Sequence, residues 1–510
     1  MKNLFLILMT FLVTFGLNAQ NTVVLQPDKA ETVINKNIYG HFSEHLGTCI
    51  YEGIYVGENS EIPNINGYRI DVIEAFKELK VPVLRWPGGC FADTYHWKDG
   101  IGPKESRPSM VNVHWGGVTE DNSFGTHEFL DFCELIGTEP YLSINVGSGT
   151  VQEAAEWVEY VTSSNESPMT ELRKQNGRED PWNVKFWGIG NETWGCGGDM
   201  RPEYYADIYR HFAGYVRGND FQRLAVGPSA DDYNWTEKLM DVLKDKQQLV
   251  QAISLHYYTL PTGNWGDKGP SINFKEDQWF STFKNTLKIE EFIQKHLAIM
   301  DKYDPRGRVK LAVDEWGTWY DPLPGTNPGF LQQQNSVRDA LVAGVNLNIF
   351  NNYAGRISMA NIAQIVNVLQ AVILTNGAEM VKTPTYYVFK MFNVHQDATL
   401  VPTLLSSEMY EYNGQKLPAI TSSASVKNGV TSITLTNINP NKAISIDCIV
   451  DGVDFKNVSA QIVTAPNMTD LNDFGKNEKV NIADFKIAKP KNGRLTLEIP
   501  AHSVILVQLK

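Results

Sequence analysis

The sequence lacks several features that define common protein classes. Its five cysteines, Cys49, Cys90, Cys133, Cys196 and Cys448, are widely spaced and include no CxxC pair. This pattern does not indicate a disulfide scaffold or a zinc site, and it does not say which two would pair in an oxidising compartment. The chain has no basic run, and its formal net charge is −13. An acidic chain of this kind argues against nucleic acid and anionic membrane surfaces as partners.

Beyond the N-terminus, the sequence also lacks any apolar run long enough to span a membrane. At the N-terminus, Lys2 precedes a short apolar stretch from Leu4 to Val13, and Leu17-Asn18-Ala19 fits a cleavage site. This pattern predicts a signal peptide over residues 1–19 and an exported protein, periplasmic or secreted. The stretch is too short for a transmembrane span, and the alternative is an ordinary buried strand or helix.

What the sequence does contain is the composition of an ordinary globular protein. Its 510 residues are 42% apolar and 20% charged, which excludes disordered and coiled-coil chains and suggests about two domains. The 12 tryptophans and 21 tyrosines would suit a sugar ligand, because sugar rings present C–H faces that stack on aromatic planes. Aromatic side chains mostly fill cores, however, so composition alone does not establish a sugar site.

From about Ile38 to about Gly377, short apolar runs alternate with longer amphipathic stretches. Each run is almost continuously apolar, as is typical of buried parallel strands. The eight runs are Ile38–Phe42, Val81–Trp86, Tyr141–Val146, Val184–Ile189, Arg223–Gly227, Ala252–His256, Val309–Val313 and Leu347–Phe350. Helical patterns between them include Val72–Leu79, Thr126–Ile136, Val151–Val161 and Pro202–Arg217. This alternation predicts an α/β chain with a (β/α)8 TIM barrel, and the runner-up, a doubly wound sheet, lacks a GxGxxG fingerprint.

Beyond about Thr383, helical periodicity fades and short β-rich runs separated by turn residues begin. They include Val430–Thr436, Ala443–Val450, Arg494–Ile499 and Val504–Leu509. This change predicts a C-terminal all-β sandwich. The segment Thr22–Val33 is also strand-like and can pair with it. We therefore expect an N-terminal strand segment at 20–37, a barrel at 38–380 and the sandwich at 381–510.

Polar residues follow several predicted strands, at the end where barrel active sites lie. Asn191-Glu192 ends the fourth strand and Asp314-Glu315 ends the seventh, while Glu44 follows the first and Arg85 closes the second. A carboxylate directly after a buried strand costs free energy unless it is paired or used in function. One such glutamate would equally fit a structural ion pair, but two at the same barrel mouth favour a catalytic pair.

Two carboxylates that face each other are what hydrolysis of a glycosidic bond requires. One donates a proton to the leaving oxygen, and the other attacks the anomeric carbon or activates water. Their pKa values must differ, so that the acid is protonated while the nucleophile is ionised. A separation of about 5–5.5 Å gives retention and about 6.5–9.5 Å gives inversion, and the sequence does not fix this distance.

The sixth predicted strand has a polar face. Side-chain alternation places Ser254, His256 and Tyr258 on one face, and Leu255 and Tyr257 on the other. Either face could be the barrel interior. The polar set suits a mouth lined with hydrogen-bonding groups, so we expect His256 and Tyr258 at the site. Satisfied polar groups in the core are the alternative.

Five segments of the sequence stand in the order of one known enzyme family. They are Ile38–Gly47, Leu84–Phe91, Gly188–Trp194, Val313–Trp316 and Met359–Asn367. Through them the chain resembles the α-L-arabinofuranosidases of glycoside hydrolase family 51. Asn-Glu alone is shared by many barrel glycosidases, whereas the five segments together are specific and the resemblance covers nearly the whole mature chain. It implies a barrel with a jelly-roll-like sandwich, and an exo-acting retaining enzyme that releases terminal non-reducing α-L-arabinofuranosyl residues from plant polysaccharides or oligosaccharides.

The resemblance also implies a role for each matching residue. Glu192 would be the acid/base and Glu315 the nucleophile, which Arg85 would keep ionised. Glu44, Arg85 and Gln364 would bind sugar hydroxyls or orient the two glutamates, and Asn191 would bind the 2-hydroxyl. Tyr258, or else Tyr257, would lie beside the nucleophile. Trp115 and Trp319 would form walls of the substrate pocket. Family members often form hexamers, so the resemblance implies a homo-oligomer.

At Cys90 the sequence departs from the pattern of many family members. These have asparagine after the Pro-Gly-Gly turn, where it binds the sugar. A thiol is a weak donor and a poor acceptor, so we expect Cys90 to line the pocket with an altered contact at that hydroxyl. A nucleophilic role for Cys90 is not expected, because no His–Cys arrangement supports it.

Three other functions compete with this interpretation. An endo-acting glucanase or xylan-cleaving enzyme on the same barrel would have an open groove, and the long loop from Trp97 to Phe124 mildly favours a closed exo site. A non-catalytic sugar-binding protein would not need both Glu192 and Glu315. A metal-dependent hydrolase is disfavoured because no HExxH motif or aspartate-rich cluster is present, and we expect neither a metal nor a cofactor.

Overall fold

The structure is a computed structural model that describes residues 21–450, 455, 457–487 and 494–510. The predicted signal peptide at 1–19 lies outside the described residues. Among the described helices, none combines the length and apolar composition that crossing a membrane would require.

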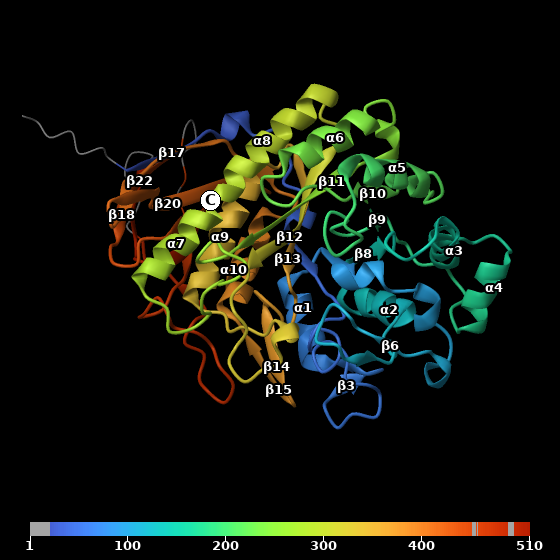
Figure 1. Ribbon diagram of the computed structural model, residues 1–510. Helices are drawn as coiled ribbons and strands as arrows, with labels where there is room; N and C mark the ends of the chain where they lie inside the picture. Colours follow the sequence, from blue (N-terminus) through green and yellow to red (C-terminus); the bar gives the residue numbers. More distant parts are fainter. Residues whose placement is uncertain (1–20, 451–454, 456, 488–493) are drawn as a thin grey trace, which may run out of the picture.

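Eight parallel strands close into a barrel, as the alternation of apolar runs predicts (Figure 1). In their order around the barrel they are β2 (Gly40–Phe42), β5 (Val83–Trp86), β8 (Glu139–Ile144), β9 (Phe186–Ile189), β10 (Gln222–Ala225), β11 (Ala252–Thr259), β12 (Lys310–Thr318) and β13 (Ile357–Ala363). Pairing of β13 with β2 closes the ring. Side chains such as Val83, Leu224 and Met359 fill its interior, so the barrel is a packed core.

Helices lie between successive barrel strands. They are α1 (Ile70–Leu79), α2 (Thr126–Ile136), α3 (Val151–Thr162), α4 (Pro168–Gln175), α5 (Pro202–Ala213), α6 (Tyr233–Leu243), α7 (Glu276–Thr286), α8 (Lys288–Tyr303) and α9 (Val337–Asn352), and α10 (Pro384–Phe392) follows the barrel. Their boundaries have local causes. Thr150 caps α3 by accepting a hydrogen bond from the Glu153 N–H, and Gly137 ends α2 at a φ of 74°.

The eighth predicted strand is wrong. Leu347–Phe350 is the C-terminal part of helix α9, and the eighth strand is β13, ten residues further on. Helix α9 is buried on all sides from Val337 to Asn351, so its apolar residues are not confined to one face. A short apolar run from such a helix cannot be distinguished from a buried strand by periodicity.

A β-sandwich follows the barrel, as expected from the C-terminal sequence. One sheet contains β17 (Thr403–Ser406), β1 (Thr22–Leu25), β22 (Ile444–Val450) and β25 (Arg494–Ile499) in that order. The other contains β16 (Thr399–Leu400), β20 (Ile420–Lys427), β21 (Val430–Asn437), β26 (Ser503–Leu509), β23 (Val458–Val463) and β24 (Ile482–Asp484). In Figure 1 the orange and red strands of the sandwich gather at one side, beside α7 and α9.

Four short hairpins complete the described strands. They are β3 (Asn64–Ile65) with β4 (Tyr68–Arg69), β6 (Met110–Val111) with β7 (Thr119–Glu120), β14 (Ile373–Asn376) with β15 (Glu379–Lys382), and β18 (Met409–Tyr412) with β19 (Gln415–Pro418). The β6–β7 hairpin belongs to the long loop after β5 that also carries Trp115.

Candidate active site

The carboxyl ends of the barrel strands bring the predicted residues to one mouth. Arg85 lies in β5, His256 and Tyr258 in β11 and Glu315 in β12, while Glu44 follows β2, Asn191-Glu192 follows β9, Trp319 follows β12 and Gln364 follows β13. His256 and Glu315 are direct neighbours in the parallel register of β11 and β12. This is the end of the barrel at which catalytic groups belong.

Glu315 is a buried carboxylate held at both oxygens. The Arg85 guanidinium donates to Oε1 at 2.8 Å, and the Tyr258 hydroxyl donates to Oε2 at 2.9 Å. Tyr257 instead donates to a backbone carbonyl of α7. Burial raises the pKa of Glu315, whereas the cations His256 and Arg85 lower it. Arg85 therefore acts in the expected direction, but burial outweighs it.

Glu192 faces His256 across the barrel mouth. Its Oε1 lies 2.8 Å from Nδ1 of His256, and Nε2 of the same ring lies 3.2 Å from Oδ1 of Asp314. Burial alone would lower the pKa of His256, but Glu315, Asp314 and Glu192 raise it to about 10. The imidazolium form donates from both ring nitrogens, which matches a ring placed between two carboxylates.

The two glutamates lie close together. One carboxylate oxygen of Glu192 lies within 4.8 Å of one of Glu315. Carboxyl groups about 5–5.5 Å apart belong to retaining glycosidases, and separations of about 6.5–9.5 Å leave room for the water that inverting enzymes use. This close approach favours retention.

Asn191 and the turn after it fix the direction of Glu192. The side-chain oxygen of Asn191 accepts from Arg85 at 2.5 Å, and its backbone N–H donates to Asp93 at 3.0 Å. Glu192 has a φ of 40°, in the left-handed region that non-glycine residues rarely adopt. The N–H of Gly195 donates to the Glu192 carbonyl at 2.7 Å and holds this turn. A strained backbone held by its surroundings is common where a catalytic side chain must be aimed.

Glu44 accepts hydrogen bonds from the loop after β5, from Trp115 and from Gln364. Its Oε1 accepts from two backbone N–H groups in the loop after β5 and, at 2.8 Å, from the indole of Trp115. Its Oε2 accepts from Gln364 at 3.0 Å. Burial, followed by the charge of Glu315, raises the pKa of Glu44 to about 7.

Two cavities meet at Glu192. A small one of about 60 Å³ is lined by Glu44, Leu46, Gly89, Cys90, Trp115, Glu192, Tyr258, Glu315, Trp319, Leu331, Gln364 and Leu369. A larger one of about 430 Å³ is lined by residues that include Glu192, Trp194, His256, Tyr258, Trp265 and Trp319. Glu192, 18% exposed, thus borders both cavities, whereas Glu315, 6% exposed, borders only the smaller one. Arg85 and Asn191 are buried and line neither cavity, but the Asn191 side chain lies close to Gly89, which does line the small one.

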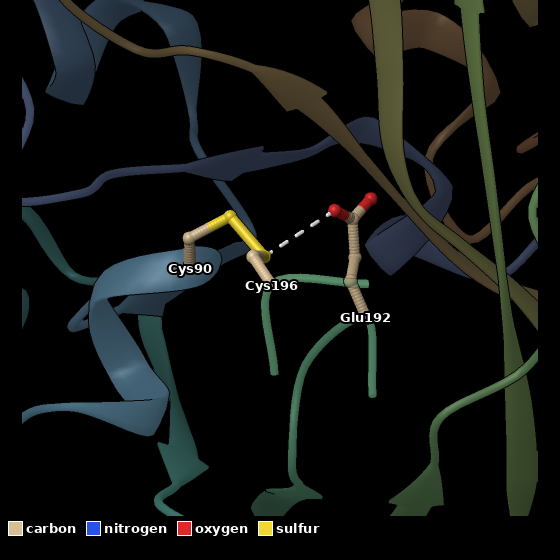
Figure 2. A group of neighbouring side chains, drawn as sticks. All are labelled: Cys90, Glu192 and Cys196. Carbon is tan, nitrogen blue, oxygen red and sulfur yellow. Dashed lines mark hydrogen bonds between the residues drawn. A yellow bond between two sulfur atoms is a disulfide. The ribbon is translucent and has the colours of Figure 1, made fainter. Parts of the chain in front are cut away.

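Cys90 lines the small cavity, but it is not a free thiol. It forms a disulfide with Cys196, which lies four residues after Glu192 (Figure 2). The expectation that a thiol stands at this point in the pocket is therefore wrong. A pairing across 106 residues is a tertiary contact that the cysteine spacing does not reveal.

Among the described residues, two groups of side chains have the spacing of metal ligands, but their atoms are engaged in other bonds. Glu192, His256 and Glu315 present atoms within 4.8 Å of one another, as do Cys90, Glu192 and Cys196. Both ring nitrogens of His256 are engaged in hydrogen bonds, Nδ1 with Glu192 at 2.8 Å and Nε2 with Asp314 at 3.2 Å. The two sulfurs of the second group are bonded to each other and are not thiolates.

Sequence reasoning missed three residues that shape the site. Asp314 pairs with His256 and accepts from Tyr141 at 2.8 Å. Asp93 binds the backbone of Asn191. Cys196 closes the disulfide. Only Asp314 gave a signal, because it directly precedes Glu315 at a strand end.

A (β/α)8 barrel whose mouth holds two carboxylates this close, inside a pocket walled by indole rings, defines a glycoside hydrolase. Comparison with known proteins names the family. Residues 75–270 match the α-L-arabinofuranosidase 1 domain, and residues 314–503 match the α-L-arabinofuranosidase C-terminal domain. The chain belongs to the α-L-arabinofuranosidases of glycoside hydrolase family 51.

Individual relatives agree with this assignment along the whole chain. An intracellular exo-α-L-arabinofuranosidase of Bacteroides ovatus is 51% identical over 97% of both chains. α-L-Arabinofuranosidase C of Emericella nidulans is 32% identical over 96% of this chain and 97% of its own. The crystal structure of a family 51 arabinofuranosidase from Xanthomonas axonopodis pv. citri superposes with a TM-score of 0.94 at 47% identity, covering 96% of this chain and all of that one.

The prediction of an exported protein with a signal peptide is contradicted by these comparisons. The Bacteroides ovatus relative, which matches 97% of the chain, is named as intracellular. The prediction depended on a short apolar stretch after a single lysine. Such a stretch is also the composition of an ordinary buried segment, so the pattern was too weak to assign a location.

Proposed function

We propose that the protein is an exo-acting, retaining α-L-arabinofuranosidase in which Glu315 is the nucleophile and Glu192 the acid/base. The observation that carries this proposal is the position of Glu192 between the two cavities, close to a buried Glu315. An acid that protonates the leaving oxygen must stand between the sugar and its leaving group. The small cavity would then hold the arabinofuranosyl ring, and the larger one the leaving group.

In the first step, Glu315 attacks the anomeric carbon and forms a covalent glycosyl-enzyme, while Glu192 donates its proton to the departing oxygen. Arg85 and Tyr258 hold the attacking carboxylate in one orientation. Asn191, fixed by Arg85, lies beside Gly89 and Glu315, where it can bind the 2-hydroxyl. A hydrogen bond there that strengthens in the transition state contributes to the rate.

In the second step, Glu192 acts as a base. It takes a proton from a water molecule that enters from the leaving-group side. The water oxygen attacks the anomeric carbon, and the bond between this carbon and Glu315 breaks. The configuration of the sugar is therefore retained. Glu44 and Gln364, which are hydrogen-bonded to each other, would bind the remaining sugar hydroxyls. Trp115 and Trp319 would form the walls of the cavity around the sugar ring.

We infer exo action from the walls of the small cavity. Trp115, Trp319 and Leu331 line it, and such walls favour one terminal residue over the middle of a polymer. An endo-acting glucanase or xylan-cleaving enzyme would need an open groove and is not favoured. We infer arabinose-decorated plant polysaccharides or oligosaccharides as substrates, and a homo-oligomer by family resemblance. Released arabinose from a panel of such oligosaccharides, and the mass in solution, would test both inferences.

Two variants test the assignment of roles. Glu315→Ala should abolish hydrolysis of a 4-nitrophenyl α-L-arabinofuranoside, because the variant lacks the attacking carboxylate. Glu192→Ala should retain more activity on this activated substrate than on an arabino-oligosaccharide, since a good leaving group needs less acid assistance. Near-wild-type activity of Glu315→Ala would contradict the proposal. So would early accumulation of the inverted anomer in proton NMR spectra of the wild-type reaction.

A further inference from the structure

The disulfide joins two segments that are far apart in the sequence but adjacent at the barrel mouth. Cys90 begins the short helix η3 (Cys90–Asp93), which follows β5. Cys196 lies in the loop that follows β9 and carries Glu192. Figure 2 shows the S–S bond beside the Glu192 carboxylate, with Cys196 toward it. The covalent link thus lies within the active site itself.

The sulfur of Cys196 contacts the proposed acid/base directly. Its Sγ lies 3.7 Å from Oε2 of Glu192, the oxygen opposite to the one that faces His256 (Figure 2). A sulfur in a disulfide carries no proton and cannot donate to a carboxylate. After reduction the same sulfur would be a thiol, which can donate a weak hydrogen bond to Oε2.

The loop from Asn191 to Gly197 is held to helix η3 at both of its ends. At the start, the Asn191 N–H donates to Asp93 at 3.0 Å, and at the far end Cys196 is bonded to Cys90. A Cβ on Gly197 would stand 1.9 Å from the Asn191 carbonyl and 2.7 Å from Asp93, so the loop packs closely on itself and on η3. Glu192, with its left-handed backbone, lies between these two attachments.

The disulfide is the accessible part of the cysteine chemistry of this chain. Cys90 and Cys196 are half-buried, and Cys90 borders the sugar cavity. The free cysteines, Cys49, Cys133 and Cys448, are buried. A small reductant that enters the active site can therefore reach the disulfide, while the three free thiols remain shielded.

From this geometry we propose that the Cys90–Cys196 disulfide is a reducible link that positions Glu192 for acid catalysis. The proposal rests on the proposed function, in which Glu192 is the acid/base. Cys90 and Cys196 are positioning residues here. Cys196 acts through Glu192 and lines neither cavity.

The link opens by thiol–disulfide exchange with a dithiol. A thiolate of the dithiol attacks one sulfur of the protein disulfide and displaces the other as a thiolate, forming a mixed disulfide. The second thiol of the dithiol then displaces the remaining protein sulfur. Two electrons and two protons pass to the protein, which gains two thiols, and the dithiol becomes a cyclic disulfide.

Opening the link removes one of the two attachments that hold the Glu192 loop to helix η3. Asp93 still holds Asn191, so Asn191 and the Arg85–Glu315 contact stay in place. Glu192 then has fewer restraints on its position relative to the leaving oxygen, while its contact with His256 and the Trp194–Gly227 hydrogen bond of its loop remain. A displacement of about 1 Å at a reacting group can cost about a hundredfold in rate. The loss should fall on the step that needs the acid.

The experiment compares oxidised and dithiothreitol-reduced wild-type enzyme on two substrates. One is 4-nitrophenyl α-L-arabinofuranoside, which needs little acid assistance, and the other is an arabino-oligosaccharide, which needs much. Reduction should lower kcat on the oligosaccharide by about tenfold or more and on the aryl substrate by less than about threefold, because acid catalysis contributes about 10²–10⁴-fold. Reoxidation should restore the oligosaccharide rate.

Cys196→Ala should show the same split with and without dithiothreitol, and Cys448→Ala, in the sandwich, should respond to the reductant as the wild type does. Alkylation with iodoacetamide followed by mass spectrometry counts the thiols, and Cys90 and Cys196 should label only after reduction. Equal losses on both substrates in Cys196→Ala, or no loss, would overturn the proposal and leave the disulfide a structural bond. Absence of activity in oxidised wild type would instead contradict the proposed function.

Discussion

The pKa values of two adjacent carboxylates of β12, Asp314 and Glu315, are shifted in opposite directions. Burial raises the pKa of Glu315. Burial also acts to raise the pKa of Asp314, but Arg85 and His256 outweigh it and hold this pKa below its usual range. Asp314 therefore ionises more readily than Glu315, and both carboxylates raise the pKa of His256. The nucleophile, in contrast, depends on its donors to remain ionised at the pH of the reaction.

Removing one of these donors should change the pH profile. Tyr258→Phe deletes the hydrogen bond to Oε2 of Glu315, which stabilises the charged form and so lowers its pKa. A hydrogen bond to a charged group contributes about 1.5–3 kcal/mol, so kcat/KM should fall by roughly tenfold to a hundredfold. The acidic limb of the kcat/KM profile should move to higher pH, because Glu315 must be ionised to attack.

The matched control is Tyr257→Phe, whose hydroxyl donates to a backbone carbonyl of α7. This variant should leave the acidic limb where it is in the wild type. An unchanged limb in Tyr258→Phe, or equal shifts in both variants, would show that Tyr258 does not stabilise the nucleophile.

Most of the site residues could be predicted from the sequence, and the reason lies in the fold. Glu192, Glu315 and Arg85 each stand at a strand end, and parallel strands of a barrel present these ends at one mouth. Asp93 and Cys196 could not be predicted in the same way. Their partners lie 98 and 106 residues away, in contacts made by loops whose paths no local pattern determines.

At the level of secondary structure, the sequence predicted seven of the eight barrel strands and misplaced the last. Helix α9 has apolar residues on more than one face because the barrel covers one side and the sandwich the other. Strand β13, in contrast, carries Ser358, Asn361 and, just beyond its end, Gln364, so it lacks a continuous apolar run. The polar residues of β13 therefore concealed its strand pattern in the sequence. The buried apolar run of α9 was mistaken for a strand.

Two of the glycines in the loop after β9, Gly195 and Gly197, have very different surroundings, and they provide a test of how rigid this loop must be. Gly197→Ala would place a Cβ 1.9 Å from the Asn191 carbonyl, so the backbone beside Glu192 must shift. We expect kcat on an arabino-oligosaccharide to fall by about a hundredfold, as for a displacement of about 1 Å. In Gly195→Ala the nearest atom is the Glu192 carbonyl oxygen at 3.7 Å, an ordinary contact.

Gly195→Ala should therefore stay within about twofold of wild type, as expected for a substitution worth about 0.5 kcal/mol or less. Melting temperatures of both variants separate a loss of folding from a loss of catalysis. Similar rates for the two alanine variants would mean that the loop adapts freely and that its packing does not position Glu192.

For the whole molecule, helix α9 is an element that belongs to the barrel and also contacts the sandwich. Its Asn348 donates to Thr421 of β20, and its side-chain oxygen accepts from Thr434 of β21 at 2.7 Å and from Ser423 at 2.9 Å. Strand β1 pairs with β17 and β22, so the chain enters the sandwich before it forms the barrel. The boundaries at residues 38 and 381 stay a prediction, and these shared contacts favour cooperative unfolding of both parts.

The buried charge of His256 predicts how the stability of the whole molecule depends on pH. Its folded pKa of about 10 lies above the ordinary histidine value of 6.5, so the folded state binds more protons than the unfolded state between these values. The corresponding stability is complete below pH 6.5 and is lost as the pH rises through 10. Between pH 7 and 9 the free energy of unfolding should fall by on the order of 2 kcal/mol, since one pKa unit corresponds to about 1.4 kcal/mol.

Other buried groups leave the sign of this pH dependence unchanged. Burial raises the pKa of Asp93 and of Glu44 to about 7, so they add to the fall. Burial lowers the pKa of His41 and of His395 to about 3, which leaves them neutral in both states above pH 7. Urea unfolding at pH 7, 8 and 9 measures the slope. His256→Asn should flatten it, and His41→Asn should keep it at a lower overall stability. A wild-type stability that rises over this range would mean that His256 is neutral in the folded enzyme, and that the charged cluster between Glu192 and Asp314 does not exist in solution.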